Sequence, residues 1–117
     1  MNNKSIIPIG AISELLNVHE RTLRIYDKEG LLIPKRNKKN RRMYSQNDLE
    51  KANLILYLTR NLALNLAGVK TIFGLFEELK IKPDEYIELI NKVSKKNNFN
   101  EKANLHKTSK RGRKKQT

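Results

Sequence analysis

The sequence reads RTLRIYDKEGLLIP over residues 21–34, and this stretch predicts a short two-faced helix with a sharp end. Leu23 and Tyr26, three residues apart, share one face of such a helix. The other face carries three basic residues at helical spacing: Arg21, Arg24 and Lys28. Gly30 follows where a residue free to adopt positive φ is expected. We therefore predict one face packed in a core and one basic face open to a partner.

A second short helix is predicted just before it, over IGAISELL at residues 9–16. Ile12, Leu15 and Leu16 lie at helical spacing there, which predicts one buried side. Asn17 tolerates the left-handed conformation that closes a helix, and the next helix begins close behind it. Two short helices joined by so tight a turn indicate a helix-turn-helix.

The segment after the two helices, KRNKKNRRMY at residues 35–44, has no helical apolar period. Its two asparagines, Asn37 and Asn40, favour turns, so we predict a small hairpin, or wing. Ser45 and Asp48 have the spacing of a capping box, which predicts a helix over about Gln46 to Asn61.

Two more amphipathic helices are predicted in the second half of the chain. After Asn65, the run 67–79 carries apolar residues at i, i+3, i+4 and i+7. Pro83 then begins a last helix, whose apolar stripe runs from Tyr86 to Val93. The sequence therefore predicts a mainly α protein.

The charge is high and concentrated. The chain has 25 Lys and Arg against 12 Asp and Glu, a formal net charge of +13 at pH 7. Residues 35–42 hold six of these bases and residues 102–115 hold seven. Solubility alone does not require such a charge, so we expect a polyanionic partner. The basic tail, 97–117, is expected to be disordered and to serve as a DNA arm or a solubilising end.

Several classes of protein are disfavoured by composition. The chain has no cysteine, which excludes disulfides, thiolate zinc sites and cysteine redox sensing. No apolar run reaches the roughly 20 residues of a membrane span, so we expect a cytoplasmic protein. No nucleophile with an adjacent base and no phosphate-binding glycine loop is present, so we expect neither an enzyme nor a cofactor. The only histidines, His19 and His106, predict no metal site.

Short motifs at fixed separations carry a family resemblance over about residues 6–78. They are Ile9-Gly10, Arg21-Thr22-Leu23-Arg24, Tyr26-Asp27, Glu29-Gly30-Leu31-Leu32, Pro34, Arg42-Met43-Tyr44-Ser45 and Asp48-Leu49. This pattern resembles the DNA-binding domain of the MerR family of transcription regulators. The resemblance implies a winged helix-turn-helix that binds double-stranded DNA as a homodimer at an inverted repeat. It divides the chain into a DNA-binding domain (1–80), a short C-terminal dimerisation helix (81–96) and the tail (97–117).

Carried onto this sequence, the resemblance implies that the second helix, which begins after His19 and ends near Gly30, enters the major groove while the wings contact phosphates. Tyr26 has two interpretations, phosphate contact or core packing, because it shares a face with Leu23. The sequence departs from the family at His19, which holds the cap position, and at Ile25, which replaces a tyrosine. The expected DNA contacts are Arg21, Thr22, Arg24, Tyr26, Lys28, Lys38, Lys39, Arg41, Arg42, Tyr44, Arg60 and Lys70.

Within the family, the short length and the stretches 57–60 and 65–69 resemble the heat-shock repressors of the HspR subfamily. That likeness implies repression of chaperone genes, in some members with a chaperone as co-repressor. The charge alone also permits a nonspecific RNA-binding or nucleoid-associated protein. For the last helix we expect a dimer contact through Ile87, Ile90 and Val93; the alternative is that this stripe folds onto Phe73 and Phe76 of the same chain.

Overall fold

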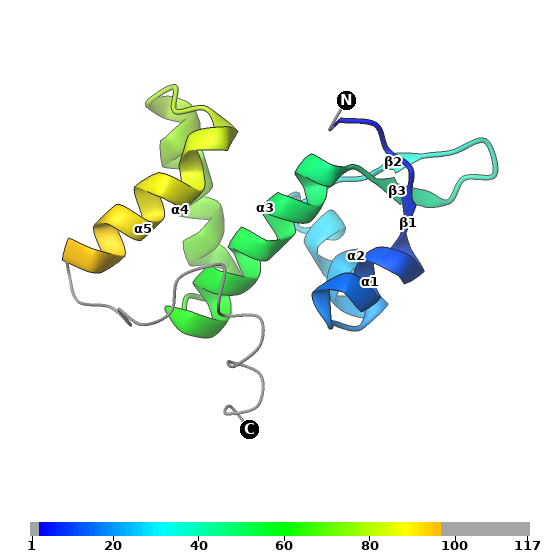
Figure 1. Ribbon diagram of the computed structural model, residues 1–117, viewed down its shortest axis with the longest axis horizontal. Coiled ribbons are helices and arrows are strands. Elements are labelled where there is room, and N and C mark those ends of the chain that lie inside the picture. Colours follow the sequence, from blue (N-terminus) through cyan, green and yellow to red (C-terminus); the bar gives the residue numbers. More distant parts are fainter. Residues whose placement is uncertain (1–2, 97–117) are drawn as a thin grey trace. The chain divides into compact units, whose positions relative to one another are not determined.

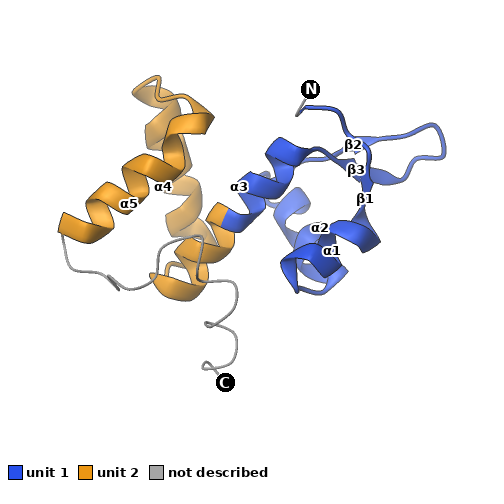
Figure 2. Ribbon diagram, viewed as in Figure 1, with its two compact units in different colours: residues 1–53 blue, residues 54–117 orange. Residues whose placement is uncertain are grey.

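The computed structural model describes residues 3–96, which form five α-helices and three short strands within that range (Figure 1). In chain order the elements are β1 (Ile7–Pro8), α1 (Ile9–Leu16), α2 (Glu20–Lys28), β2 (Lys35–Arg36), β3 (Arg42–Tyr44), α3 (Gln46–Leu56), α4 (Leu66–Glu78) and α5 (Tyr86–Lys96). The chain divides into two compact units, Met1–Asn53 and Leu54–Thr117 (Figure 2). The tail that the sequence assigns to residues 97–117 lies outside the described residues.

The first unit contains the predicted helix-turn-helix, built from α1 and α2. Asn17 ends α1 with φ 60°, the left-handed conformation expected there. Its backbone N–H donates to the Glu14 carbonyl at 3.1 Å, so the last turn of α1 is closed by a hydrogen bond. Gly30 has φ 76° just beyond α2 and directs the chain away from the helix. Both predicted helix ends are therefore confirmed.

The predicted hairpin is also present, as strands β2 and β3 of an antiparallel sheet. Arg36 lies opposite Arg42 in the register of these strands. A third strand, β1, pairs on the other side of β3, with Ile7 opposite Tyr44. The sheet order is therefore β1-β3-β2, and β1 is an addition that the sequence pattern did not predict.

Apolar side chains from every part of the first unit close its core. Ile12 of α1 and Leu23 of α2 are completely buried, and so is Tyr44 of β3. Leu31 and Leu32, just after Gly30, are buried too. This arrangement of two helices and a small sheet is a mainly α winged helix-turn-helix, as the sequence predicts.

Helix α3 begins with the predicted capping box. The Asp48 carboxylate accepts from the Ser45 backbone N–H at 2.9 Å, and the Ser45 hydroxyl accepts from the Asp48 backbone N–H at 3.0 Å. The expected single α-helix to Asn61 is wrong in one respect. The α-helical part ends at Leu56, and Tyr57–Asn61 form a π-helical turn. A π turn accommodates more residues than an α turn, so it rotates the faces of the residues after it.

The second unit packs α5 against α4 through aromatic rings. The Tyr86 ring centroid lies 4.5 Å from that of Phe76 and 5.5 Å from that of Phe73. Ile90 is buried at 7% exposure, and Ser94 on the same face is buried as well. The inner face of α5 is therefore covered by its own unit.

The start of each of these two helices has an identifiable cause. The Asn65 side chain accepts from the Gly68 backbone N–H at 2.8 Å and caps α4. Pro83–Glu85 form a 3₁₀ turn immediately before α5.

None of the helices within residues 3–96 is long and apolar enough to cross a membrane.

Candidate nucleic-acid interface

Helix α2 has the two faces that its sequence predicts. Leu23 and Tyr26 are buried, at 0% and 4% exposure, whereas Arg21, Arg24 and Lys28 are exposed. Thr22 is half-buried between the two faces. The buried residues fix the rotation of the helix, so its basic side chains point away from the core of the first unit.

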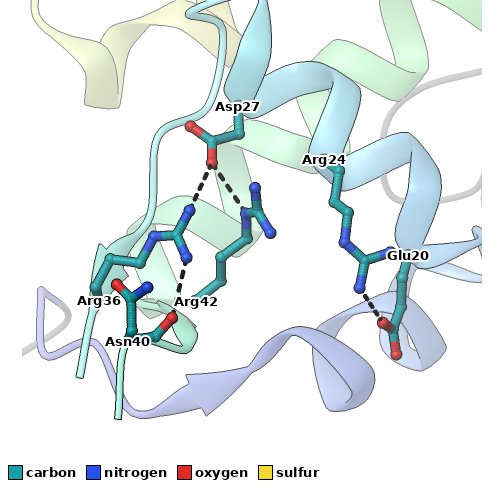
Figure 3. Close-up of polar contacts among 6 residues, drawn as sticks. All are labelled: Glu20, Arg24, Asp27, Arg36, Asn40 and Arg42. Atoms are coloured by element: carbon teal, nitrogen blue, oxygen red, sulfur yellow. Dashed lines mark hydrogen bonds and ion pairs between the residues drawn. The ribbon is translucent and has the colours of Figure 1, made fainter. Parts of the chain in front are cut away.

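An ion pair lies on the exposed face of α2. The Arg24 Nη2 atom lies 3.0 Å from Glu20 Oε1, one helical turn earlier (Figure 3). The two side chains are 50% and 42% exposed. Exposed i, i+4 pairs on helices stabilise by only about 0.3–0.5 kcal/mol, so a nucleic acid can displace Glu20 from Arg24 at little cost.

The hairpin turn is held by one asparagine side chain. Asn37 Oδ1 accepts from the backbone N–H groups of Lys39 and Arg41, both at 2.9 Å. Asn40 completes the turn with φ 63°, a conformation that asparagine adopts more readily than most residues. The turn therefore depends on backbone and asparagine groups, and the exposed side chains of Lys38, Lys39 and Arg41 are free to contact a ligand.

Asp27 of α2 joins the helix to the hairpin. Its Oδ2 atom accepts from Arg42 Nε at 2.9 Å and lies 4.0 Å from Arg36 Nη2 (Figure 3). The Asp27 and Arg42 side chains are only 18% and 23% exposed. Sequence reasoning gave no site role to Asp27 or Arg36. The available signal was the carboxylate within a basic motif, but its partners lie 9 and 15 positions away along the chain.

Two tyrosines predicted to contact DNA are core residues in the structure. Tyr44 is completely buried and Tyr26 nearly so. Burial raises the pKa of Tyr44 to about 12. For Tyr26 the structure favours the packing interpretation, and a phosphate contact by the hydroxyl of either tyrosine stays a prediction.

The remaining predicted contacts belong to the second unit. Arg60 lies in the π-helical turn and Lys70 in α4, and both are exposed.

In the first unit, His19 is exposed at the start of α2 and makes no cap hydrogen bond with its side chain, in line with its residue type. The first unit thus brings together the basic face of α2 and the hairpin, the two parts of a winged helix-turn-helix that contact DNA.

Comparison with known proteins identifies the family. Residues 7–74, more than half of the chain, match the model of the MerR HTH family regulatory proteins. The chain belongs to this family of helix-turn-helix regulators.

Curated relatives agree with this assignment. The transcriptional regulator GlnR of Bacillus anthracis is 37% identical over 67 residues, which cover 57% of this chain and 51% of GlnR. A heat shock protein HspR of Streptomyces coelicolor is also 37% identical over 67 residues, which cover 57% of this chain and 44% of HspR. A ZntR homologue of Haemophilus influenzae is 31% identical over 85 residues, 72% of this chain and 62% of that regulator. The matched part spans about half the length of the first of these relatives.

Proposed function

We propose that this protein is a sequence-specific regulator of transcription that binds double-stranded DNA, with α2 in the major groove. The observation that carries the proposal is the exposed basic face of α2 (Arg21, Arg24 and Lys28) beside a hairpin whose turn exposes three further basic side chains. Arginine presents a planar fork that matches guanine edges in the major groove. A helix of this length fits that groove, and its buried face anchors it in the protein.

The hairpin supplies phosphate contacts in this proposal. Lys38, Lys39 and Arg41 project from a turn that the Asn37 side chain holds, so their ammonium and guanidinium groups can follow the phosphate positions. Such contacts position a protein on DNA and contribute most of its salt-dependent affinity, but they carry no sequence information. In this arrangement α2 reads sequence and the hairpin fixes the register. Arg60 and Lys70 would be the corresponding contacts of a second wing.

We further propose that the regulator acts as a homodimer on an inverted repeat. One short recognition helix contacts too few base pairs to select a single genomic site. Of the three residues expected in the dimer contact, Ile90 is buried in its own unit, whereas Val93 is 46% exposed and Ile87 is half-buried. A two-fold contact through α5 would therefore use Val93 and Ile87.

Repression of heat-shock and chaperone genes is the regulatory role we propose, with the protein acting in the cytoplasm. The likeness to HspR of Streptomyces coelicolor supports it. GlnR of Bacillus anthracis has the same identity, 37% over 67 residues, so the competing proposal is that the protein regulates a different set of genes. A genome-wide map of bound DNA distinguishes the two, because the heat-shock role predicts occupancy upstream of chaperone genes that is lost on a temperature shift.

Selection from a pool of random duplexes tests the proposed function directly. We expect recovery of an inverted repeat that binds at least about 10³-fold more tightly than random duplex at matched salt. Structured RNA is included as a competitor. Recovery of no common sequence, or equal competition by RNA and random duplex, would favour the alternative of a nonspecific RNA-binding or nucleoid-associated protein.

A further inference from the structure

The contact between Asp27 and the hairpin arginines is the strongest unexplained feature of the first unit. One carboxylate oxygen, Asp27 Oδ2, receives the Arg42 guanidinium at 2.9 Å and has that of Arg36 at 4.0 Å. The other side of Arg36 is also fixed, because its Nη1 donates to the Asn40 carbonyl at 3.0 Å (Figure 3). The chain of contacts therefore runs from the recognition helix through both strands to the turn.

The strand register shows why a carboxylate is needed at this place. Arg36 and Arg42 lie directly opposite each other on β2 and β3. Like charges in a cross-strand pair destabilise a hairpin. Asp27 comes from outside the hairpin and offsets that repulsion, so the pairing of the two strands is linked to α2.

The hairpin depends on contacts with the rest of the first unit. Its strands are Lys35–Arg36 and Arg42–Tyr44, far shorter than a strand pair that is stable by itself. Pairing of β3 with β1 and burial of Tyr44 secure one side of it. On the side of β2, both residues of the strand are exposed, and Arg36 of this strand lies 4.0 Å from Asp27 of the helix.

We propose that Asp27 is a positioning residue for DNA recognition: it holds Arg36 and Arg42 against α2, which sets the place of the hairpin relative to the recognition helix. It also occupies two guanidinium groups that would otherwise bind phosphates of any sequence. Arg42, which the family resemblance assigns to DNA, acts through Asp27 in this proposal and contacts no phosphate. The proposal rests on the proposed DNA-binding function.

Asp27→Asn tests this role, because it keeps the shape of the side chain and removes its charge. We expect binding to random duplex to strengthen. If the contribution of a released arginine to the affinity is zero near 1 M salt, a slope of about 0.9 makes it about fivefold at 0.15 M salt for each arginine. The dependence of log K on log salt should steepen by about 0.9 per released arginine. Discrimination between the selected duplex and random duplex should fall, because the hairpin loses its fixed place.

The matched control is Glu14→Gln, which makes the same change in net charge at an exposed position of α1 in the same unit. It should leave both the salt slope and the discrimination at their wild-type values. If Asp27→Asn matches this control in its affinity for random duplex, its salt slope and its discrimination between duplexes, the proposal is wrong. If the wild type itself does not discriminate between duplexes, the proposed function fails, and that result is visible before any variant is compared.

Arg42→Gln provides a second test that does not depend on the stability of Asp27→Asn. Because Arg42 contacts no phosphate in this proposal, the salt slope on random duplex should stay unchanged while discrimination falls. A slope that flattens by about 0.9 would instead show a direct phosphate contact and would overturn the proposal. Circular dichroism melting of each variant accompanies these measurements, so that a change in binding is compared among folded proteins.

Discussion

The hairpin turn allows a clean test of phosphate binding, because its lysine side chains can be removed without removing the hydrogen bonds that hold the turn. Lys38 and Lys39 are exposed, and the turn is held by backbone groups and by Asn37 Oδ1. Replacing both lysines with Ala keeps the Lys39 backbone N–H that donates to Asn37. We therefore expect the double variant to fold as the wild type does, with thermal unfolding unchanged.

The expected effect on DNA binding is set by the number of contacts removed. Two lost phosphate contacts should flatten the dependence of log K on log salt by about 1.8. The ratio of wild-type to variant affinity should then change about 12-fold between 50 and 200 mM salt, on specific and random duplexes alike. Fluorescence anisotropy at four or five salt concentrations measures this slope.

The control for this experiment removes the same charge from another surface. Lys92 and Lys95 are exposed on α5, and their double replacement with Ala should leave the slope of the wild type intact. A slope for the Lys38 and Lys39 variant that equals that of the control would refute phosphate binding by the hairpin. The two lysines would then be solvated surface residues.

Four further variants test the packing and helix capping of the two units. Ile90→Ala should lower the free energy of unfolding by about 2–5 kcal/mol in a denaturant titration, because the Ile90 side chain is buried. Val93→Asp should leave stability near wild type, and this variant should sediment as a monomer if α5 forms the dimer contact. A stable dimer for Val93→Asp would move the interface elsewhere. Asn65→Ala should cost about 1 kcal/mol through loss of the α4 cap, and an unchanged midpoint would contradict that role. Tyr44 has its pKa raised by burial to about 12, so its neutral form is favoured in the folded state; stability from this group is present below pH about 10 and is lost as the pH rises toward 12. Tyr44→Phe should remove that alkaline loss in pH-dependent melts, and an identical loss in both proteins would show that another group causes it.

Local patterns explain most of the features that sequence reasoning predicted correctly. The left-handed ends at Asn17 and Gly30 and the Ser45–Asp48 capping box each depend on residues within a few positions of one another. The faces of α2 are set by helical period alone, and the turn of the hairpin is set by its asparagines. These features need no knowledge of distant contacts.

The features that sequence reasoning missed depend on distant partners or on an irregular backbone. Strand β1 is two residues long and exists because Ile7 meets Tyr44, 37 positions later. The tie between Asp27 and Arg42 spans 15 positions and has no periodic signature. The π turn at Tyr57–Asn61 interrupts an apolar stripe that the sequence pattern continues without a break.

The apolar stripe of α5 shows the same limit in another form. Its spacing predicts one apolar face but cannot say which surface covers that face. The structure covers Tyr86 with Phe73 and Phe76 of the same unit and buries Ile90 there. Val93 stays 46% exposed at the edge of the stripe. The structure therefore supports packing within the chain for Tyr86 and Ile90, and a dimer contact through Val93 stays a prediction.

Replacement of Arg24 with Ala tests most directly whether the basic face of α2 reads DNA sequence. Arg24 is exposed, and its pair with Glu20 contributes little, so its removal should leave the fold intact. The measurement is the ratio of affinities for the selected duplex and for random duplex, with Lys92→Ala as the control. A base-reading arginine is worth about 1–3 kcal/mol of discrimination, so we expect the ratio to fall between about fivefold and 150-fold while random binding changes less. Equal weakening on both duplexes would contradict sequence reading by α2 through Arg24.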